Sequence, residues 1–412
     1  MNAEQKADLN AVFDGWKNAG NLDYVACWYK HAADLMQGTN IRSALVSTNS
    51  VTQGEAVANL WKPLFEAGVH IDFAHRTFIW DSETKVKAHV HCVIIGFSIA
   101  PNTKSKVLFT GDRPQLVDNI NAYLIDAENV FVESRNKPIC DIPEIGIGNK
   151  PIDDGNYLFT ETEMKEFLVK EPAAEKWFKP WYGSQEFINR KPRYCLWLGN
   201  CPPNELRKMP ECMKRVEATR QFRLSSKSAG TVKLADKPTR FHVENMPDST
   251  YVVIPEVSSE RRRYIPMGFM TPDSLASNLV KVVPDASLYH FGVLTSNVHM
   301  AWVRAVCGRL KSDYRYSKDV VYNNFPWPTP TDAQKAKIEQ TAQAILDARA
   351  LYPDASLADL YDEVAMPPEL RKAHQQNDKA VMQAYGFDIK TTTETSCVAE
   401  LMKMYQHLTE KE

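Results

Sequence analysis

Three consecutive arginines follow a glutamate in the segment SSERRRY, which spans residues 258–264. If this segment is extended, Glu260 and Arg262 point to one side, and Arg261 and Arg263 point to the other. Glutamate can accept a hydrogen bond from cytosine and arginine can donate two to guanine, so this pair suits the edges of base pairs. The other two arginines would then bind phosphate. A plainer interpretation is that Glu260 neutralises a neighbouring arginine in a surface turn.

A second basic segment lies about 35 residues earlier in the chain, at residues 204–228. Such a row of cations can follow the phosphates of a nucleic acid. We predict phosphate contacts for Lys208, Lys214, Arg215, Arg220, Arg223 and Lys227. Lys208, Arg215 and Lys227 share one side if a helix continues past Pro210; the alternative is a solvated helix face. Lysine and arginine outnumber aspartate and glutamate between Arg190 and Lys318, although the whole chain has a net charge of -2.

Two groups of aromatic residues could also carry chemistry. Phe78 and Trp80 alternate along a predicted strand, where they either line a site or pack in the core. Tyr322, Phe325 and Trp327 are interleaved with prolines. Proline cannot continue a helix or a strand, and the aromatic rings can bury a large area, so we interpret this segment as a packed strap. A platform for stacking bases is the alternative.

Other motifs carry little weight. The sequence NCPP at residues 200–203 invites comparison with the Asn-Pro-Pro-aromatic motif of amino-methyltransferases, but Cys201 interrupts it and a capped helix explains the prolines. The sequence GIGN at residues 146–149 lacks the strand and helix of a phosphate loop. STNS at residues 47–50 is either a site loop or a turn. The eight cysteines are scattered, so we expect reduced thiols and no metal site.

The elements that position these residues begin as an α/β pattern. Helix and strand signals alternate over residues 22–97, and two apolar strands at residues 69–80 and 86–97 predict a hairpin. We expect this hairpin to form an antiparallel edge on an otherwise parallel sheet. Residues 100–160 are irregular and predict loops. A helix follows, with Thr160 and Glu163 as a capping box, and the chain is mainly helical from about residue 332.

Composition limits the class of protein. The chain has 412 residues, of which 44% are hydrophobic and 24% charged, so it can fold around two or three cores. It contains no apolar run of about 18 residues and starts with a polar segment, so we expect neither a membrane span nor a secretory signal. A cytoplasmic location follows as the default.

Eight stretches, taken in order, resemble one family: the MmeI-like type IIG restriction-modification enzymes and their adenine-N6 DNA methyltransferase relatives. The stretches are LDYVACWYKHAADLM, STNSVTQGEAVANLW, IDFAHRTFIW, AHVHCVIIGF, GSQEFINRKPRYCLWL, YVVIPEVSSERRRYIPMGF, YSKDVVYNNFPWP and LADLYDEVAMPPELRKAHQQNDKAVMQAYGF. The resemblance implies an α/β plus α+β fold in three parts. These are the last strands of a Rossmann-like methyltransferase sheet at residues 1–138, a mixed target-recognition domain at 139–328, and a helical C-terminal domain at 329–412.

The resemblance also implies that this chain carries DNA recognition but lacks the motifs for methyl transfer. Intact relatives use S-adenosyl-L-methionine and flip an adenine out of double-stranded DNA. The Gly-rich cofactor motif and the Asn-Pro-Pro-Phe/Tyr loop of the family are missing from this chain, so no catalytic site is complete in it and we expect no methylation by the chain alone. Trp80, or Phe78 in its place, is the candidate for stacking the flipped base. By the same resemblance, SSERRRY lies where DNA is read, with Glu260 and Arg262 on bases and Arg261 and Arg263 on the backbone.

Two other functions remain open. The chain could be a non-enzymatic specificity subunit that folds alone or docks on a separate catalytic chain, such as the missing N-terminal methyltransferase half. That partner would cover the apolar strand at residues 41–46, whose neighbouring position is otherwise empty. A decayed gene fragment is the third possibility.

Overall fold

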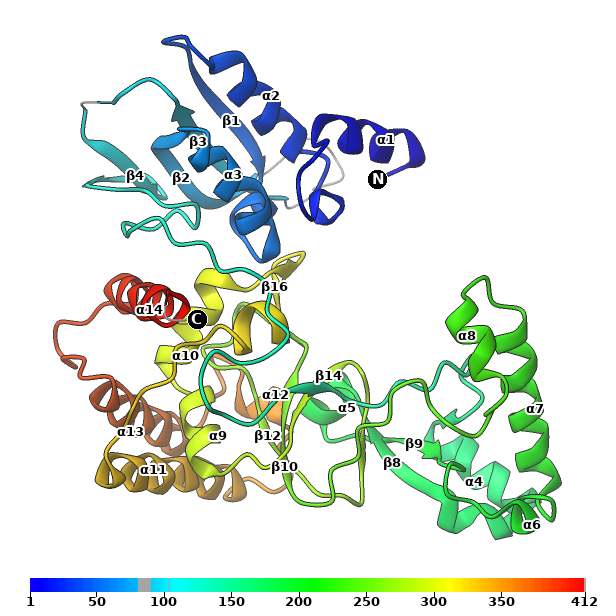
Figure 1. Cartoon of the computed structure of the whole chain (residues 1–412). Helices are drawn as coiled ribbons and strands as arrows, with labels where there is room; N and C mark the ends of the chain where they lie inside the picture. Colours follow the sequence, from blue (N-terminus) through cyan, green and yellow to red (C-terminus); the bar gives the residue numbers. More distant parts are fainter. Residues whose placement is uncertain (81–89, 103, 411–412) are drawn as a thin grey trace. The chain divides into compact units, whose positions relative to one another are not determined.

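The computed structural model describes residues 1–80, 90–102 and 104–410. These residues form two compact units, each assembled from separate stretches of the chain (Figure 1). Unit 1 contains residues 1–141, 297–331 and 382–412, and unit 2 contains residues 142–296 and 332–381. Within the described residues, no helix has the length and apolar character needed to cross a membrane.

Unit 1 is built on a five-stranded sheet with the order β1-β3-β2-β4-β5. Its strands are β1 (Arg42–Thr48), β2 (His70–Trp80), β3 (Val90–Ser98), β4 (Lys106–Thr110) and β5 (Arg113–Val117). Strands β2 and β3 pair antiparallel, which confirms the predicted pairing. Strand β3 also pairs antiparallel with β1, so the expectation that the hairpin forms the edge of the sheet is wrong. Strands β4 and β5 lie in a region where we expected loops.

The helical elements of unit 1 come from both ends of the chain and from the middle. They are α1 (Ala3–Val12), η1 (Ala19–Asn21), α2 (Ala26–Met36), η2 (Asn49–Thr52), η3 (Val57–Trp61), α3 (Lys62–Glu66), α10 (Asn297–Val306), η5 (Lys318–Tyr322) and α14 (Glu394–Thr409). A short hairpin joins β15 (Arg309–Leu310) to β16 (Asp313–Arg315).

Aromatic side chains fix the helices of unit 1 to its sheet. The Tyr29 ring of α2 lies 5.3 Å from the Trp61 ring of η3 and 5.5 Å from the Phe97 ring of β3, measured between centroids. All three rings are fully buried. Burying large aromatic side chains removes much apolar surface from water. The Tyr29 hydroxyl also bonds the Ser47 hydroxyl, and the Trp61 indole N–H donates to the Val51 carbonyl, both at 2.8 Å, so the cluster orients β1 and the turn that follows it.

The proline-rich strap is buried, as expected. Tyr322, Phe325 and Trp327 are 0%, 1% and 5% exposed. The side-chain amide of Asn324 donates to the Glu133 and Asp319 carbonyls, both at 2.8 Å. Because these bonds hold the strap against other segments of unit 1, the rings serve the core and leave no face for stacking bases.

Unit 2 contains two four-stranded sheets, with the orders β12-β10-β14-β6 and β13-β8-β9-β7. The strands of unit 2 are β6 (Gly146–Ile147), β7 (Leu158–Phe159), β8 (Phe178–Tyr182), β9 (Arg193–Leu196), β10 (Tyr251–Pro255), β11 (Val257–Ser258), β12 (Gly268–Met270), β13 (Leu275–Ala276) and β14 (Val280–Val283). The helical elements are α4 (Glu161–Lys170), η4 (Pro172–Trp177), α5 (Ser184–Asn189), α6 (Pro203–Leu206), α7 (Pro210–Leu224), α8 (Ala229–Leu234), α9 (Leu288–Leu294), α11 (Asp332–Ala350), α12 (Leu357–Leu360) and α13 (Pro368–Ala384).

The predicted capping box starts α4. The Thr160 hydroxyl accepts from the Glu163 backbone N–H at 3.3 Å, and the Glu163 carboxylate accepts from the Thr160 backbone N–H at 2.7 Å. This helix and strands β7 to β9 surround a core that includes Trp181, Trp197 and Phe241. Figure 1 shows α7 and α8 beside this sheet, so the core forms the support for the basic segment.

Candidate nucleic-acid interface

The basic segment does not form one continuous helix. Helix α6 ends at Leu206 and α7 begins at Pro210, because proline is favoured in the first turn of a helix and disfavoured in its interior. Lys208 therefore lies between the helices, and Lys227 lies beyond the end of α7. The expectation of a single helix face through Lys208, Arg215 and Lys227 is wrong, although Lys208 and Lys227 are exposed.

Arg223 has a structural role, and its predicted contact with phosphate is wrong. Its side chain is 0% exposed. Each of its five N–H groups donates to a backbone carbonyl, at 2.9 to 3.1 Å; the acceptors are Pro151, Ile152, Leu234, Lys237 and Arg240. Since guanidinium has only five N–H groups, none remains for DNA. Burial lowers the pKa of Arg223, with Tyr157 and Asp153 acting in the opposite direction.

The other cations of α7 can reach solvent. Lys214 and Arg220 are exposed and pair with Glu211 at 2.7 Å and Glu217 at 3.3 Å. Such exposed pairs contribute little to stability, so either cation can turn to a phosphate at small cost. Arg215 is half-buried, with its guanidinium 4.9 Å from the centre of the Phe159 ring.

The Glu-Arg-Arg-Arg segment is a turn and is not extended. The Arg262 N–H donates to the Ser259 carbonyl at 3.2 Å, which closes a four-residue β-turn. Glu260 and Arg261 occupy its tip, and both are exposed. Alternation along a strand therefore no longer supports the pairing of Glu260 with Arg262. The turn still carries Glu260 on a solvent-exposed tip beside three arginines, with Arg263 also exposed and Arg262 half-buried.

In unit 1, the candidate stacking residues lie at one end of the sheet. Strands β1 and β2 both run antiparallel to β3, so their carboxyl ends share the edge where β3 begins. Trp80 is 51% exposed there, and Phe78 is half-buried with its ring 6.3 Å from the Trp80 ring. The side-chain amide of Asn49 donates to the Thr77 hydroxyl at 3.3 Å, which ties the end of β1 to β2.

The weaker motifs have structural roles. Pro203 begins α6, as expected for a helix lead-in, and Asn149 of GIGN donates its buried amide to the Asn245 and Ala276 carbonyls. The STNS motif runs from the end of β1 into the short helix η2. All eight cysteines are free and buried or half-buried. Among the described residues, no cluster of His, Cys, Asp or Glu could hold a metal ion.

Three family descriptions match the chain in succession. They are "MmeI, DNA-methyltransferase domain" at residues 1–110, "MmeI, target recognition domain" at 126–329 and "MmeI, C-terminal domain" at 330–411. This chain belongs to the MmeI family. The predicted fold class is confirmed by this match and by the mixed α/β architecture with helices towards the C-terminus.

Two similar proteins show how much of an MmeI-family protein this chain covers. "DNA methyltransferase A" of Bacillus subtilis (strain 168) is 42% identical over 411 residues, which are 100% of this chain and 46% of that protein. The structure described as "Structure of Type IIL restriction-modification enzyme MmeI in complex with DNA has implications for engineering of new specificities" is 45% identical, with a TM-score of 0.93. It matches 100% of this chain and 55% of its own. The chain thus spans about half the length of these MmeI-family relatives.

Sequence reasoning missed one group of polar residues in unit 1. Arg76, Arg304 and Arg309 line an open pocket of about 350 Å³ together with Glu394 and Gln53. These residues come from four regions of the chain, around residues 53, 76, 304–309 and 394, so no single motif joins them. The only feature of the sequence that could have indicated this pocket is Arg76, a cation within the apolar strand sequence DFAHRTFIW.

Proposed function

We propose that this chain supplies the DNA recognition, and part of the flipped-base site, of a site-specific DNA adenine-N6 methyltransferase from a restriction-modification system. The observation that carries the proposal is the succession of methyltransferase, target-recognition and C-terminal matches over almost the whole chain. The exposed cations of α7 and of the turn at residues 259–262 support it, because double-stranded DNA is recognised first through its phosphates. The DNA complex described for MmeI is a further support.

The proposed division of contacts follows from exposure. Lys208, Lys214, Arg220, Lys227, Arg261 and Arg263 are exposed and would bind the backbone, with Arg215 available from its half-buried position. Glu260 and Arg262 would contact bases, since backbone contacts position a protein and base edges specify the sequence. Changing Glu260 or Arg262 to Ala should cost about 1–3 kcal/mol on the preferred site and relax one base position. Equal loss on every sequence would identify these residues as phosphate contacts.

At the sheet edge, Trp80 would stack on an adenine turned out of the duplex. An aromatic side chain that is half exposed next to strand ends can offer its face to a base. Phe78 is the alternative, and its lower exposure makes it the support of the Trp80 ring. Neither residue transfers a proton or a methyl group, so their contribution is to hold the base in position.

The residues described here do not form a complete pocket for S-adenosyl-L-methionine. Rossmann-type cofactor sites need a strand, a Gly-rich turn and a helix in succession. In this sheet β1 leads into η2 through Thr48 and Asn49, and β2 pairs with the antiparallel β3. We therefore assign the chain no step of methyl transfer, and use of S-adenosyl-L-methionine is proposed only for the complete enzyme.

A binding measurement tests the proposal. The chain and a labelled 30-base-pair duplex are titrated at several KCl concentrations between 50 and 200 mM. We expect affinity to fall steeply with salt, by about 10³ or more if six or more phosphates are contacted. Absence of binding at 50 mM KCl, or binding that salt leaves unchanged, would contradict the assignment as a DNA-reading chain.

One observation favours a second function, a specificity subunit that docks on a separate catalytic chain. Strand β1 ends the sheet order, so among the described residues its outer edge has no paired strand. Ile41, which directly precedes β1, and Val46 within it are 55% and 54% exposed. Unpaired edges with exposed apolar residues invite pairing with another chain. A purified chain that stays monomeric and whose β1 amides are protected from hydrogen exchange would argue against this partner.

A further inference from the structure

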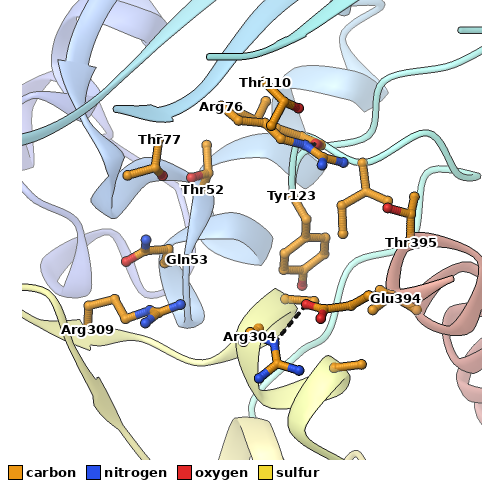
Figure 2. A pocket seen from close by; sticks show the side chains of 15 residues that line it. Thr52, Gln53, Arg76, Thr77, Thr110, Tyr123, Arg304, Arg309, Glu394 and Thr395 are labelled. Atoms are coloured by element: carbon orange, nitrogen blue, oxygen red, sulfur yellow. Dashed lines mark hydrogen bonds and ion pairs between the residues drawn. The ribbon is translucent and has the colours of Figure 1, made fainter. Parts of the chain in front are cut away.

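The pocket in unit 1 combines three cations with a single carboxylate. Arg76 comes from β2, Arg304 from α10, Arg309 from β15 and Glu394 from the start of α14. Arg304 pairs with Glu394 at 2.7 Å, so these two charges cancel. Arg76 and Arg309 have no such ion pair within the described part of the chain and leave the pocket with an excess of positive charge. Figure 2 shows the side chains of Arg309 and Gln53 extending into the pocket from one side and that of Tyr123 from another.

Arg76 is held in place through only part of its guanidinium. Its Nε donates to the Leu124 carbonyl at 2.9 Å, and burial lowers its pKa, with the carboxylates of Glu394 and Asp126 opposing the shift. Arginine nevertheless stays charged in proteins. Its two terminal nitrogens have no hydrogen-bond partner among the described residues. The register of β2 with β3 shifts between His75 and Phe78, and such irregularities re-aim side chains next to functional sites.

Arg309 is held by contacts with its own hairpin, in contrast to Arg76, which is held by Leu124. Its guanidinium lies 3.9 Å from the centre of the Tyr314 ring, and its Nη1 donates to the Ser312 carbonyl at 3.2 Å. Its Nε is buried without a hydrogen-bond partner. A buried N–H with no acceptor is costly unless a ligand supplies one. Gln53 and Thr77 line the same pocket and add neutral donors.

The ligand that fits these donors is a phosphate group. Guanidinium groups bind phosphate oxygens through paired, charge-assisted hydrogen bonds, and amide and hydroxyl groups complete the shell. The place of the pocket indicates the source, because Arg76 and Thr77 directly precede Phe78 on β2. Four residues of extended strand, about 13 Å, separate Arg76 from Trp80. A base that is flipped onto Trp80 would bring the backbone of its own strand to this edge.

We propose that this pocket holds a phosphodiester group of the DNA strand whose adenine is flipped onto the sheet edge. This proposal rests on the proposed function, because it requires that the chain bind duplex DNA. It adds to unit 1 a contact with the backbone that is separate from the basic residues of unit 2. The pocket thus fixes the strand next to the flipped base, and it does so equally for every DNA sequence.

The test compares variants of the full chain in the same salt titration of a labelled duplex. Arg309→Gln should make the plot of log K against log [KCl] shallower by about 0.9, as expected for one lost phosphate contact. If the two proteins bind equally at 1 M KCl, this difference in slope makes the variant bind about eightfold more weakly than the wild-type chain at 0.1 M KCl. Lys6→Gln is the matched control, because Lys6 is exposed on α1 of the same unit and lies outside the pocket.

A second variant separates binding from folding. Gln53→Glu keeps the size of the side chain and places a carboxylate beside two unpaired arginines, so the melting temperature should not fall. DNA binding should nevertheless weaken at least as much as in Arg309→Gln. If the wild-type chain binds DNA with a salt dependence that both variants leave unchanged, the pocket proposal is wrong and the proposed function stands. If the wild-type chain does not bind duplex DNA, both fail.

Thermal melting in inorganic phosphate tests whether the ligand of the pocket is a free anion and not DNA. Thermal melting is followed in phosphate and in chloride at matched ionic strength. A phosphate-induced stabilisation that Arg309→Gln abolishes, together with unchanged DNA binding in this variant, would assign the pocket to a free anion and overturn the DNA contact. The result we expect is a shallower salt slope in Arg309→Gln and weaker DNA binding in both Arg309→Gln and Gln53→Glu, with neither change in Lys6→Gln.

Discussion

Replacing Arg223 by Met should destabilise unit 2 while barely touching the DNA-binding surface. The change removes five hydrogen bonds to carbonyls at 2.9 to 3.1 Å from a side chain that is 0% exposed. Five bonds from a charged donor at about 1.5 kcal/mol each give about 7.5 kcal/mol. About 3 kcal/mol returns because the methionine no longer buries a charge. The net loss is therefore about 4 to 5 kcal/mol.

Thermal unfolding measures this loss. For a unit of about 200 residues, a loss of about 4 to 5 kcal/mol lowers the melting temperature by roughly 8–20 °C. Arg220→Met is the matched control on the same helix, because Arg220 is exposed and should change stability by less than about 0.5 kcal/mol. The reasoning is refuted if Arg223→Met melts within 2 °C of the wild-type chain and weakens DNA binding as much as Arg220→Met does.

Further predictions concern stacking, charge and pH. Trp80→Ala should weaken binding of a duplex with an unpaired adenine by about 1–3 kcal/mol, more than Phe78→Ala, as measured by titration; a larger loss for Phe78→Ala would exchange their roles. Lys214→Gln should lower the salt slope by about 0.9 on all sequences equally, and an unchanged slope would leave Lys214 a solvated residue. Burial lowers the pKa of His299 to about 3 in the folded chain. Between about pH 6.5 and pH 3 the unfolded state therefore binds a proton at this residue more readily than the folded state, so unit 1 should lose stability as the pH falls through this range. Denaturant titrations should show a weaker pH dependence for His299→Gln, and an identical pH dependence would exclude this cause.

Local signals in the sequence identified several elements correctly. The capping box of Thr160 and Glu163 depends only on residues three positions apart, and the apolar strands at β2 and β3 are long enough to be recognised individually. Their place in the sheet depends on pairing with β1, which no local pattern encodes. Strands β4 and β5 have only five residues each and mix polar with apolar positions, so they resemble loops.

Long-range contacts explain the errors at the candidate site. Arg223 is of the same residue type as its exposed neighbours, and only the carbonyls of the distant residues Pro151 and Ile152 and of residues 234–240 reveal its structural role. The turn at residues 259–262 closes through a backbone bond that the charges do not predict. The arginine pocket gathers its residues from strands and helices up to about 340 positions apart, so its chemistry is visible only in the folded chain.

Selection from a library of random duplexes tests the central claim most directly. The purified chain is mixed with duplexes containing a randomised central segment, and the bound fraction is sequenced over several rounds. If the chain is the DNA-reading part of an MmeI-family methyltransferase, one short sequence that contains an adenine should be enriched, and Glu260→Ala should relax the selection at one position. Binding without any enriched sequence would contradict the account.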